Sequence, residues 1–124
     1  MKMKFYKCSV CGQIIAIVTD TGVPVVCCGK KMEELIPCSV DASLEKHVPV
    51  VQKEGGIIRV RVGSADHPMT DAHYIQWIAV QTKNGNQRKL LQPGDAPEAV
   101  FCVCENDKVE AVYAYCNLHG LWKA

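Results

Sequence analysis

From residue 57 to the C-terminus, the chain alternates between short apolar runs and turn residues. The runs are "IIRVRV" at 57–62, "YIQWIAVQT" at 74–82, "RKLLQ" at 88–92, "AVFCVC" at 99–104 and "VEAVYAY" at 109–115. Such runs, bounded by turn residues, predict β-strands. No window shows the sustained 3.6-residue period of an amphipathic helix, and "KKMEELI" at 30–36 amounts to at most one or two helical turns.

Turn residues separate these predicted strands. In "KNGN", Asn84 and Gly85 supply the two positive-φ residues of a tight hairpin between the runs at 77–82 and 88–92. The stretch "QPGDAP" at 92–97 holds two prolines and one glycine and marks a second turn. Regularly spaced strands without helices predict a β-sandwich of the immunoglobulin-like kind.

The first 37 residues follow a different pattern. Three β-prone runs, "FYKC", "IIAIVTD" and "VPVVCC", are punctuated by Gly12, Gly22 and Gly29. The segment is too small to bury a core of its own. Because the pattern changes at Pro37, we predict a mainly β chain with a small separate domain over residues 1–37 and the sandwich over residues 38–124.

Composition and charge narrow the class of protein. Hydrophobic residues make up 48% of the 124 positions and charged residues 22%, which is normal globular usage. The net charge of +1 gives no global field that would attract nucleic acid or an anionic membrane. The N-terminus has no apolar run of signal-peptide length, and no segment approaches the ~20 apolar residues of a spanning helix. We therefore expect a cytoplasmic protein with no nucleic-acid and no membrane partner.

In a reducing compartment the eight cysteines are metal ligands or small buried hydrophobes rather than four disulfides, and no export signal supports a secreted disulfide scaffold. Cys8 and Cys11 form a C-x2-C pair, and Cys27 and Cys28 are adjacent. The alternative for the adjacent pair is plain burial or oxidation. Four thiolates from two such pairs predict a tetrahedral site for zinc or a single iron, and the spacing leaves both metals open.

A second set of candidate ligands lies in the β-rich part. It consists of one cysteine and all four histidines: His47, His67, His73, Cys116 and His119. Cys116 and His119 are three residues apart, close enough to bind one ion from a single turn. Five ligands exceed the four of a structural zinc site and suit iron with an open sixth position. A blue-copper site is the rival, but no methionine follows His119 to serve as its axial ligand.

The order of C-x2-C, C-C, "EKHVPV", "HPM", "HYIQWI", "PGDAPEA" and "CNLHGLWK" resembles the desulfoferrodoxin family, the two-centre form of superoxide reductase. The resemblance spans nearly the whole chain. It implies a rubredoxin/desulforedoxin-like domain whose iron is held by the four cysteine sulfurs, followed by a neelaredoxin-type, immunoglobulin-like domain. It also implies a homodimer that receives electrons from rubredoxin.

The resemblance further implies the active site. Its iron is square-pyramidal, with His47, His67, His73 and His119 as equatorial ligands and Cys116 as the axial ligand. The implied reaction is one-electron reduction of superoxide to hydrogen peroxide at the ferrous ion, a protection against oxidative stress. The vacant position opposite the sulfur would receive superoxide.

Glu45 and Lys46 acquire catalytic roles through the same resemblance. Lys46 would attract the anion and orient water for proton transfer, while Glu45 would bind the ferric ion after turnover. In an extended strand the two side chains would point to opposite faces. Both can approach the iron only from a loop, where we expect mobility; the alternative is a pair of solvated charges.

Two other classes of protein fit the same residues. A pure electron carrier would use only a coordinatively saturated iron, and a structural module would hold zinc at both sites. Cys38, Cys102 and Cys104 match no ligand of the family. Because Cys102 and Cys104 share one face of a predicted strand, we expect them to be buried by packing. Packing rather than chemistry is also expected for the aromatic residues near the ligands, which are Tyr74, Trp77, Tyr115 and Trp122.

Overall fold

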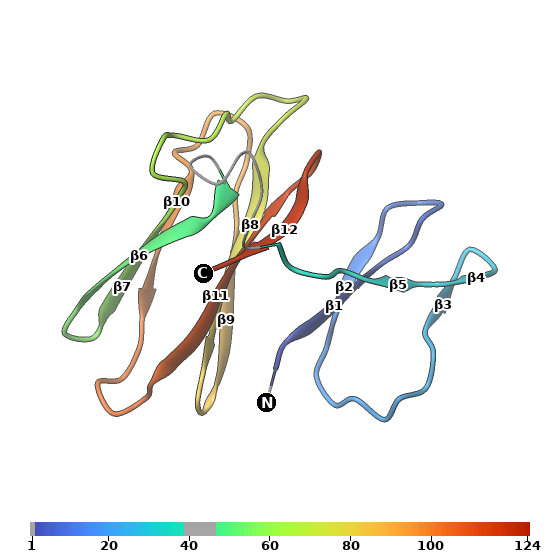
Figure 1. Cartoon of the computed structure of the whole chain (residues 1–124), viewed down its shortest axis with the longest axis horizontal. Helices are drawn as coiled ribbons and strands as arrows, with labels where there is room; N and C mark the ends of the chain where they lie inside the picture. Colours follow the sequence, from blue (N-terminus) through green and yellow to red (C-terminus); the bar gives the residue numbers. More distant parts are fainter. Residues whose placement is uncertain (1, 39–46) are drawn as a thin grey trace. The chain divides into compact units, whose positions relative to one another are not determined.

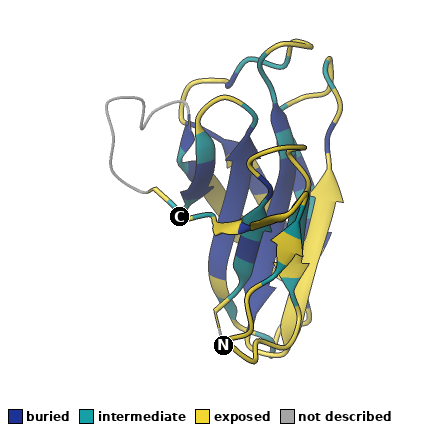
Figure 2. Cartoon of the chain, turned by 90° about the vertical axis from the view of Figure 1, so that its right-hand side faces the viewer, coloured by how far each residue is buried: buried dark blue, intermediate teal, exposed yellow. Residues whose placement is uncertain are grey.

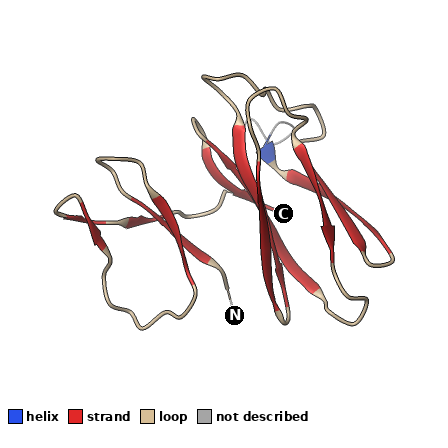
Figure 3. Cartoon of the chain, turned by 180° about the vertical axis from the view of Figure 1, so that it is seen from behind, coloured by secondary structure: helices blue, strands red, loops and turns tan. Residues whose placement is uncertain are grey.

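The structure is a computed structural model of the chain and describes residues 2–38 and 47–124. Two compact units are present, Met1–Ile36 and Pro37–Ala124. Antiparallel β-strands form the framework of both (Figures 1 and 3). The prediction of a mainly β chain is confirmed, and no helix among the described residues is long and apolar enough to cross a membrane.

The N-terminal unit contains five very short strands. A three-stranded sheet has the order β2-β1-β5, and a separate hairpin joins β3 to β4. The bounds are β1 (Lys4–Lys7), β2 (Ile14–Ile17), β3 (Val26–Cys27), β4 (Lys30–Lys31) and β5 (Glu33–Glu34). The sequence predicts at most one or two helical turns over residues 30–36, but this segment contains the strands β4 and β5 instead.

Little apolar surface is buried in this unit. Among its described residues, the buried hydrophobic side chains are Phe5, Cys8 and Met32, whereas Val18 and Val23 are exposed. Three buried side chains cannot offset the conformational entropy of ordering some 36 residues, since each ordered residue costs about 1–2 kcal/mol. The unit therefore needs another source of stability.

The C-terminal unit is a β-sandwich, as predicted. One sheet has the order β10-β7-β6 and the other the order β12-β11-β8-β9. The bounds are β6 (Pro49–Glu54), β7 (Ile57–Val62), β8 (Ile75–Thr82), β9 (Gly85–Leu90), β10 (Glu98–Cys102), β11 (Val109–Cys116) and β12 (Gly120–Lys123). The apolar runs therefore predicted β7, β8, β10 and β11 to within two residues at each end, but β6 and β12 were not predicted.

The core lies between the two sheets. In β7 the inward residues Ile58, Val60 and Val62 are fully buried, while the alternate residues Arg59 and Arg61 are exposed. Side chains from both sheets complete one hydrophobic cluster, and the buried strands are dark blue in Figure 2. A sandwich core of this kind holds the ends of its strands at fixed positions, which is where the candidate ligands are found.

The predicted hairpin between β8 and β9 is present, but its turn differs from the prediction. Thr82 pairs with Gly85, so the loop residues are Lys83 and Asn84, and neither Asn84 nor Gly85 has a positive φ. Asp107 contacts this turn. Its carboxylate accepts hydrogen bonds from the Asn84 N–H at 3.0 Å and from the Thr82 hydroxyl at 2.8 Å. Side-chain bonds from a neighbouring loop therefore hold this turn.

Candidate metal centres

The four N-terminal cysteines converge on one point. One sulfur from each of Cys8, Cys11, Cys27 and Cys28 lies within 4.8 Å of all the others. The Sγ–Sγ distances are 3.7 Å for Cys11 and Cys27 and 4.0 Å for Cys27 and Cys28. Tetrahedral sulfur ligands about 2.3 Å from one ion are about 3.8 Å apart, so the cluster has the size of a four-thiolate metal site.

Backbone conformation brings the adjacent cysteines together. Successive side chains of a strand point to opposite faces, so an extended Cys27-Cys28 pair could not face one ion. Cys28 has a φ of 52°, and among the described residues it is the only non-glycine with a positive φ. Gly29 follows with a φ of 73°. This left-handed turn is the kind of local strain that persists at functional sites.

The thiols of this cluster differ in acidity. Hydrogen bonds from the backbone N–H groups of Cys11 and Val10 lower the pKa of Cys8 to about 6. Hydrogen bonds with the Cys8 and Cys11 side chains raise the pKa of Cys27 to about 12. Four thiolates this close together would repel one another, so all four can be charged only around a cation. Binding a cation would supply folding free energy to a unit whose core is small.

The second set of candidate ligands gathers at one end of the sandwich. His47 lies two residues before the start of β6. His67 and His73 lie in the connection between β7 and β8. Cys116 is the last residue of β11, and His119 lies in the turn before β12. The sequence separation reaches 72 residues, so only the packing of the sandwich can bring these side chains together.

The four imidazoles form a closed ring of neighbours. Successive centroids are 4.9 Å apart for His47 and His67, 4.7 Å for His67 and His73, 5.0 Å for His73 and His119, and 4.8 Å for His119 and His47. Neighbouring ring planes are inclined by 68° to 81°. The rings therefore stand edge to face around a common centre.

The donor atoms have the spacing of metal ligands. One donor from each of His47, His67, His73 and Cys116 lies within 4.8 Å of the others. Nitrogen ligands on opposite sides of one ion, each about 2.1 Å from it, are about 4.2 Å apart, so this limit fits a metal site. Nδ1 of His119 completes the set, because it lies 3.1 Å from Nε2 of His47 and 3.7 Å from Sγ of Cys116.

His67 shows how one ring is prepared for a metal. Its Nδ1–H donates to the carbonyl oxygen of Pro68 at 2.7 Å, so Nε2 carries the lone pair. Nε2 is buried and has no hydrogen-bond partner. Burial, followed by the neighbouring histidines, lowers the pKa of His67 to about 4, against the opposing effect of the Pro68 carbonyl. At neutral pH the ring is therefore an uncharged, unsatisfied donor, which a cation would complete.

Cys116 is fully buried beside these rings. Burial raises the pKa of its thiol, and the backbone N–H groups of Leu118 and His119 partly oppose that shift. A buried thiolate is stable only when a cation and hydrogen-bond donors compensate for its lost hydration. This position provides the donors, and an ion among the imidazoles would provide the cation.

Trp122 supports two of the histidines. Its ring stacks on His47 with centroids 4.6 Å apart and planes inclined by 16°, and its Nε1–H donates to the His119 carbonyl at 3.2 Å. Trp77 stacks on Tyr115, with centroids 5.5 Å apart. The sequence assigned these aromatic residues to packing, but it gave no sign that Trp122 contacts the ligands themselves.

The expectation that Cys102 and Cys104 are buried is wrong. Both are exposed and free. In this part of the chain Ala99, Phe101 and Val103 point into the core, so the alternate residues face outwards. The shared face was therefore predicted correctly, but its side of the sheet was not. Cys38 is also exposed and forms a parallel bridge with Trp122.

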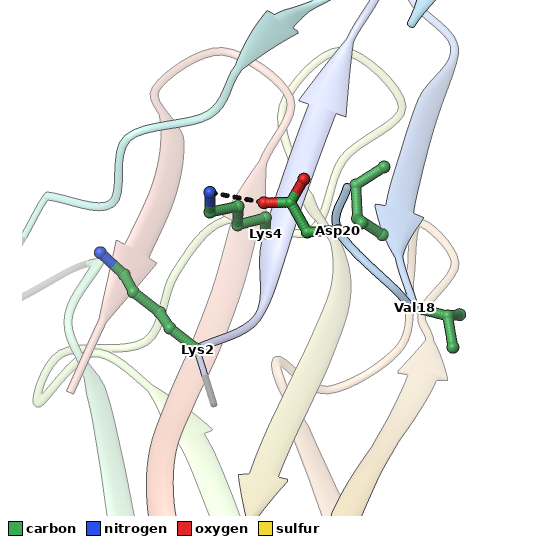
Figure 4. A pocket seen from close by; sticks show the side chains of 5 residues that line it. Lys2, Lys4, Val18 and Asp20 are labelled. Atoms are coloured by element: carbon green, nitrogen blue, oxygen red, sulfur yellow. Dashed lines mark hydrogen bonds and ion pairs between the residues drawn. The ribbon is translucent and has the colours of Figure 1, made fainter. Parts of the chain in front are cut away.

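Glu45 and Lys46, the two predicted catalytic residues, lie outside the described residues. In the N-terminal unit a small pocket is lined by Lys2, Lys4, Ile17, Val18 and Asp20 (Figure 4). Lys4 Nζ lies 2.8 Å from an Asp20 carboxylate oxygen. No candidate metal ligand lines this pocket, so it adds nothing to the chemistry of either cluster.

A β-sandwich with a cluster of four histidines and one cysteine, combined with a four-cysteine unit, defines a non-haem iron protein of the two-centre type. The chain matches the family models described as "Desulfoferrodoxin" over residues 39–124 and "Desulfoferrodoxin, N-terminal domain" over residues 1–35. It belongs to the desulfoferrodoxin family. The predicted family and the predicted iron centres are thereby confirmed.

Similar proteins cover the chain almost completely. A desulfoferrodoxin homolog of Archaeoglobus fulgidus is 47% identical over 98% of this chain and 96% of its own length. The desulfoferrodoxin of Nitratidesulfovibrio vulgaris is 46% identical over 98% of this chain and 94% of its own length. The crystal structure of the superoxide reductase from Treponema pallidum is 33% identical, with a TM-score of 0.84 over 99% of this chain and 97% of that one.

Proposed function

We propose that this protein is a superoxide reductase that transfers one electron to superoxide and, with two protons, releases hydrogen peroxide. The observation that carries this proposal is the closed ring of four imidazoles beside a buried cysteine. Family membership and the likeness to the Treponema pallidum enzyme support it.

The proposed ligands of the reactive iron are His47, His67, His73, His119 and Cys116. A ferrous ion held there would supply the electron that superoxide accepts. Imidazole ligands are uncharged, so they would not repel the superoxide anion as it approaches the iron. The Cys116 thiolate would donate electron density to the centre, and the Leu118 and His119 N–H groups would hold its sulfur in place.

We assign two further residues to the proposed active site, the acidic Glu45 and the basic Lys46, which directly precede His47. With a net charge of only +1 on the whole chain, local charge has to attract superoxide, and we assign this role to Lys46. Glu45 would supply a carboxylate ligand after turnover. Both assignments rest on the family resemblance.

We further propose that Cys8, Cys11, Cys27 and Cys28 hold the second iron and that residues 1–37 act as its domain. The sulfur spacings and the small apolar core of this unit support the proposal. Four thiolates saturate a tetrahedral ion, so this centre would store or pass electrons without binding substrate. The reactive centre would then belong to the domain over residues 38–124.

We also propose that the sandwich has an immunoglobulin-like topology and that the protein is a cytoplasmic homodimer with a rubredoxin-type electron donor. Family resemblance supports these properties. The eight cysteines, none of them in a disulfide among the described residues, fit a reducing compartment.

The test compares two cysteine substitutions in anaerobically prepared protein. Wild type should bind two irons per chain, and its oxidised form should show a sulfur-to-iron charge-transfer band from each centre. Cys116→Ser should lose the band of the second centre and slow superoxide consumption at least tenfold, because the sulfur ligand is gone. The matched control is Cys102→Ser, which removes an exposed thiol and should leave the band and the rate unchanged.

The rate of superoxide consumption is measured by pulse radiolysis. A chain that holds zinc at both centres, or that consumes superoxide no faster than its Cys116→Ser variant, would contradict the proposal.

A further inference from the structure

Asn117 lies between two proposed ligands, Cys116 and His119, and makes contacts that the ligand set alone does not explain. Its side chain reaches across to the segment that carries His73. The amide oxygen of Asn117 accepts a hydrogen bond from the Tyr74 N–H at 2.9 Å. The amide nitrogen of Asn117 donates to the Ala72 carbonyl at 3.0 Å. One side chain therefore binds the backbone on both sides of His73.

A third bond comes from the backbone. The Asn117 N–H donates to the Tyr74 carbonyl at 3.2 Å. Together the three bonds join the turn that contains Cys116 and His119 to the residues that flank His73. Side-chain and backbone groups of Asn117 thus act on the same short segment.

These bonds are placed where the sheet ends. The ladder between β8 and β11 has its last pair at Cys116 and Ile75, with an irregular register just before it. Beyond this pair, no strand pairing links the two segments among the described residues. The backbone of His73 is bonded to Thr70 within its own turn. Asn117 therefore extends the connection past the end of the ladder to the segment that bears the ligand.

We propose that Asn117 is a positioning residue that couples two ligand-bearing segments and sets the distance between His73 and His119 before a metal ion binds. The proposal rests on the proposed function for the identity of the ion, but the coupling itself is a property of the chain. The ring centroids of His73 and His119 are 5.0 Å apart, and these two histidines belong to the two segments that Asn117 joins. Residues that hold ligands in this way typically change metal affinity 10- to 100-fold when they are replaced.

An amide suits this position because it both accepts and donates. An aspartate could still accept from the Tyr74 N–H but has no donor for the Ala72 carbonyl. An alanine would lose both side-chain bonds and keep only the backbone one. The series asparagine, aspartate, alanine therefore removes the contacts stepwise.

The first experiment measures iron release from the full-length protein under anaerobic conditions. A ferrous chelator is added, and both centres are followed by their absorption. We expect release from the histidine and cysteine centre about tenfold or more faster in Asn117→Ala and less accelerated in Asn117→Asp. The sulfur-to-iron band of the oxidised centre should shift in Asn117→Ala. Asn86→Ala, an exposed asparagine of β9, is the matched control and should behave as wild type.

The four-cysteine centre serves as the reference within the same molecule. Its release rate should be equal in all variants. Wild-type release rates and an unshifted band in Asn117→Ala would overturn the proposal. Equal acceleration at both centres would also overturn it, because the substitution would then have destabilised the whole chain rather than one site.

The second experiment needs no iron, and it separates this proposal from the proposed function. Amide hydrogen exchange is measured by NMR in metal-free protein. The Tyr74 amide should exchange at least tenfold faster in Asn117→Ala than in wild type, because its acceptor is lost, and should stay protected in Asn117→Asp. Unchanged protection in Asn117→Ala would reject the coupling. A chain that shows the expected exchange but does not reduce superoxide would reject only the proposed function.

Discussion

At the scale of single residues, the proposed reactive centre depends on groups that touch the ligands rather than the ion. Pro68 sets the tautomer of His67 through its carbonyl oxygen. The Trp122 ring stacks on His47, and its Nε1–H donates a hydrogen bond to the His119 carbonyl. Such contacts fix the direction in which each donor atom points, and an imidazole binds a metal well only along the direction of its lone pair.

The substitution Trp122→Phe tests the contacts of Trp122 with the two histidines. In Trp122→Phe an aromatic face remains against His47, but the hydrogen bond to the His119 carbonyl is lost. We expect the free energy of unfolding to fall by about 1–3 kcal/mol from the lost bond and the lost volume. We also expect faster iron release from the histidine and cysteine centre. Urea unfolding and chelator kinetics measure the two effects.

Trp77→Phe is the matched control. It removes a similar volume from a buried indole that stacks on Tyr115 rather than on a ligand. It should lower stability by a similar amount and leave iron release unchanged. If both variants release iron equally fast, the contacts of Trp122 with the ligands have no special role.

At the scale of elements, side chains protect the open edge of one sheet. The Gln87 amide donates to the Cys102 carbonyl at 2.7 Å, and the Lys89 ammonium donates to the Val100 carbonyl. Both side chains come from β9, which is itself an edge strand. Because these two β10 carbonyl groups already accept hydrogen bonds, they are less available for pairing with another chain. The same contacts link the two sheets of the sandwich.

The hairpin between β6 and β7 gives the prediction at this scale. Gly56 sits against the chain that leaves β10, since a Cβ atom there would lie 3.1 Å from the Val103 carbonyl oxygen. The Gly56 carbonyl accepts a hydrogen bond from the Val103 N–H at 2.8 Å. Backbone cannot move aside as a flexible side chain would. We therefore expect Gly56→Ala to destabilise the sandwich by about 1–3 kcal/mol in urea unfolding.

Gly85→Ala is the control for this hairpin. A Cβ atom at Gly85 would meet nothing within 4 Å, and the φ of this residue lies outside the left-handed region. Its effect should stay within about 0.5 kcal/mol. Equal effects of the two substitutions would mean that the close approach of Val103 does not limit stability.

At the scale of the whole molecule, the two units differ in what holds them together. The sandwich has a continuous apolar cluster, whereas the described part of the N-terminal unit buries three hydrophobic side chains. Metal ligation can replace a core as a source of folding free energy. The N-terminal unit should therefore depend on its metal, and the sandwich should not.

Metal removal tests this difference. In the loaded protein, three thiols per chain should react rapidly with a thiol reagent, those of Cys38, Cys102 and Cys104, which are exposed and outside both clusters. After chelation the four N-terminal cysteines should join them as their unit unfolds. Cys116 should stay slow because the sandwich still buries it. Slow N-terminal thiols after chelation, or a sandwich that unfolds with metal loss, would contradict this prediction.

Most of the fold was predictable because buried strands leave a local pattern. The apolar runs in β7 and β8 mark residues that the core requires. Strand β6 was missed because it lies at a sheet edge and all its residues after Pro49 are exposed, so no burial pattern reveals it. The exposure of Cys102 could not be inferred either, since a two-residue period does not say which face meets the core.

The sequence alone determined the strand-rich class, the family and the types of donor atom, because each of these follows from residue identity and short spacing. The tertiary structure decided which of those donors meet. His47 and His119 are 72 positions apart, yet their ring nitrogens are 3.1 Å apart. Such convergence depends on how two sheets pack and where their strands end. The same packing places Asn117 beside His73 and Trp122 beneath His47, contacts that no local pattern encodes.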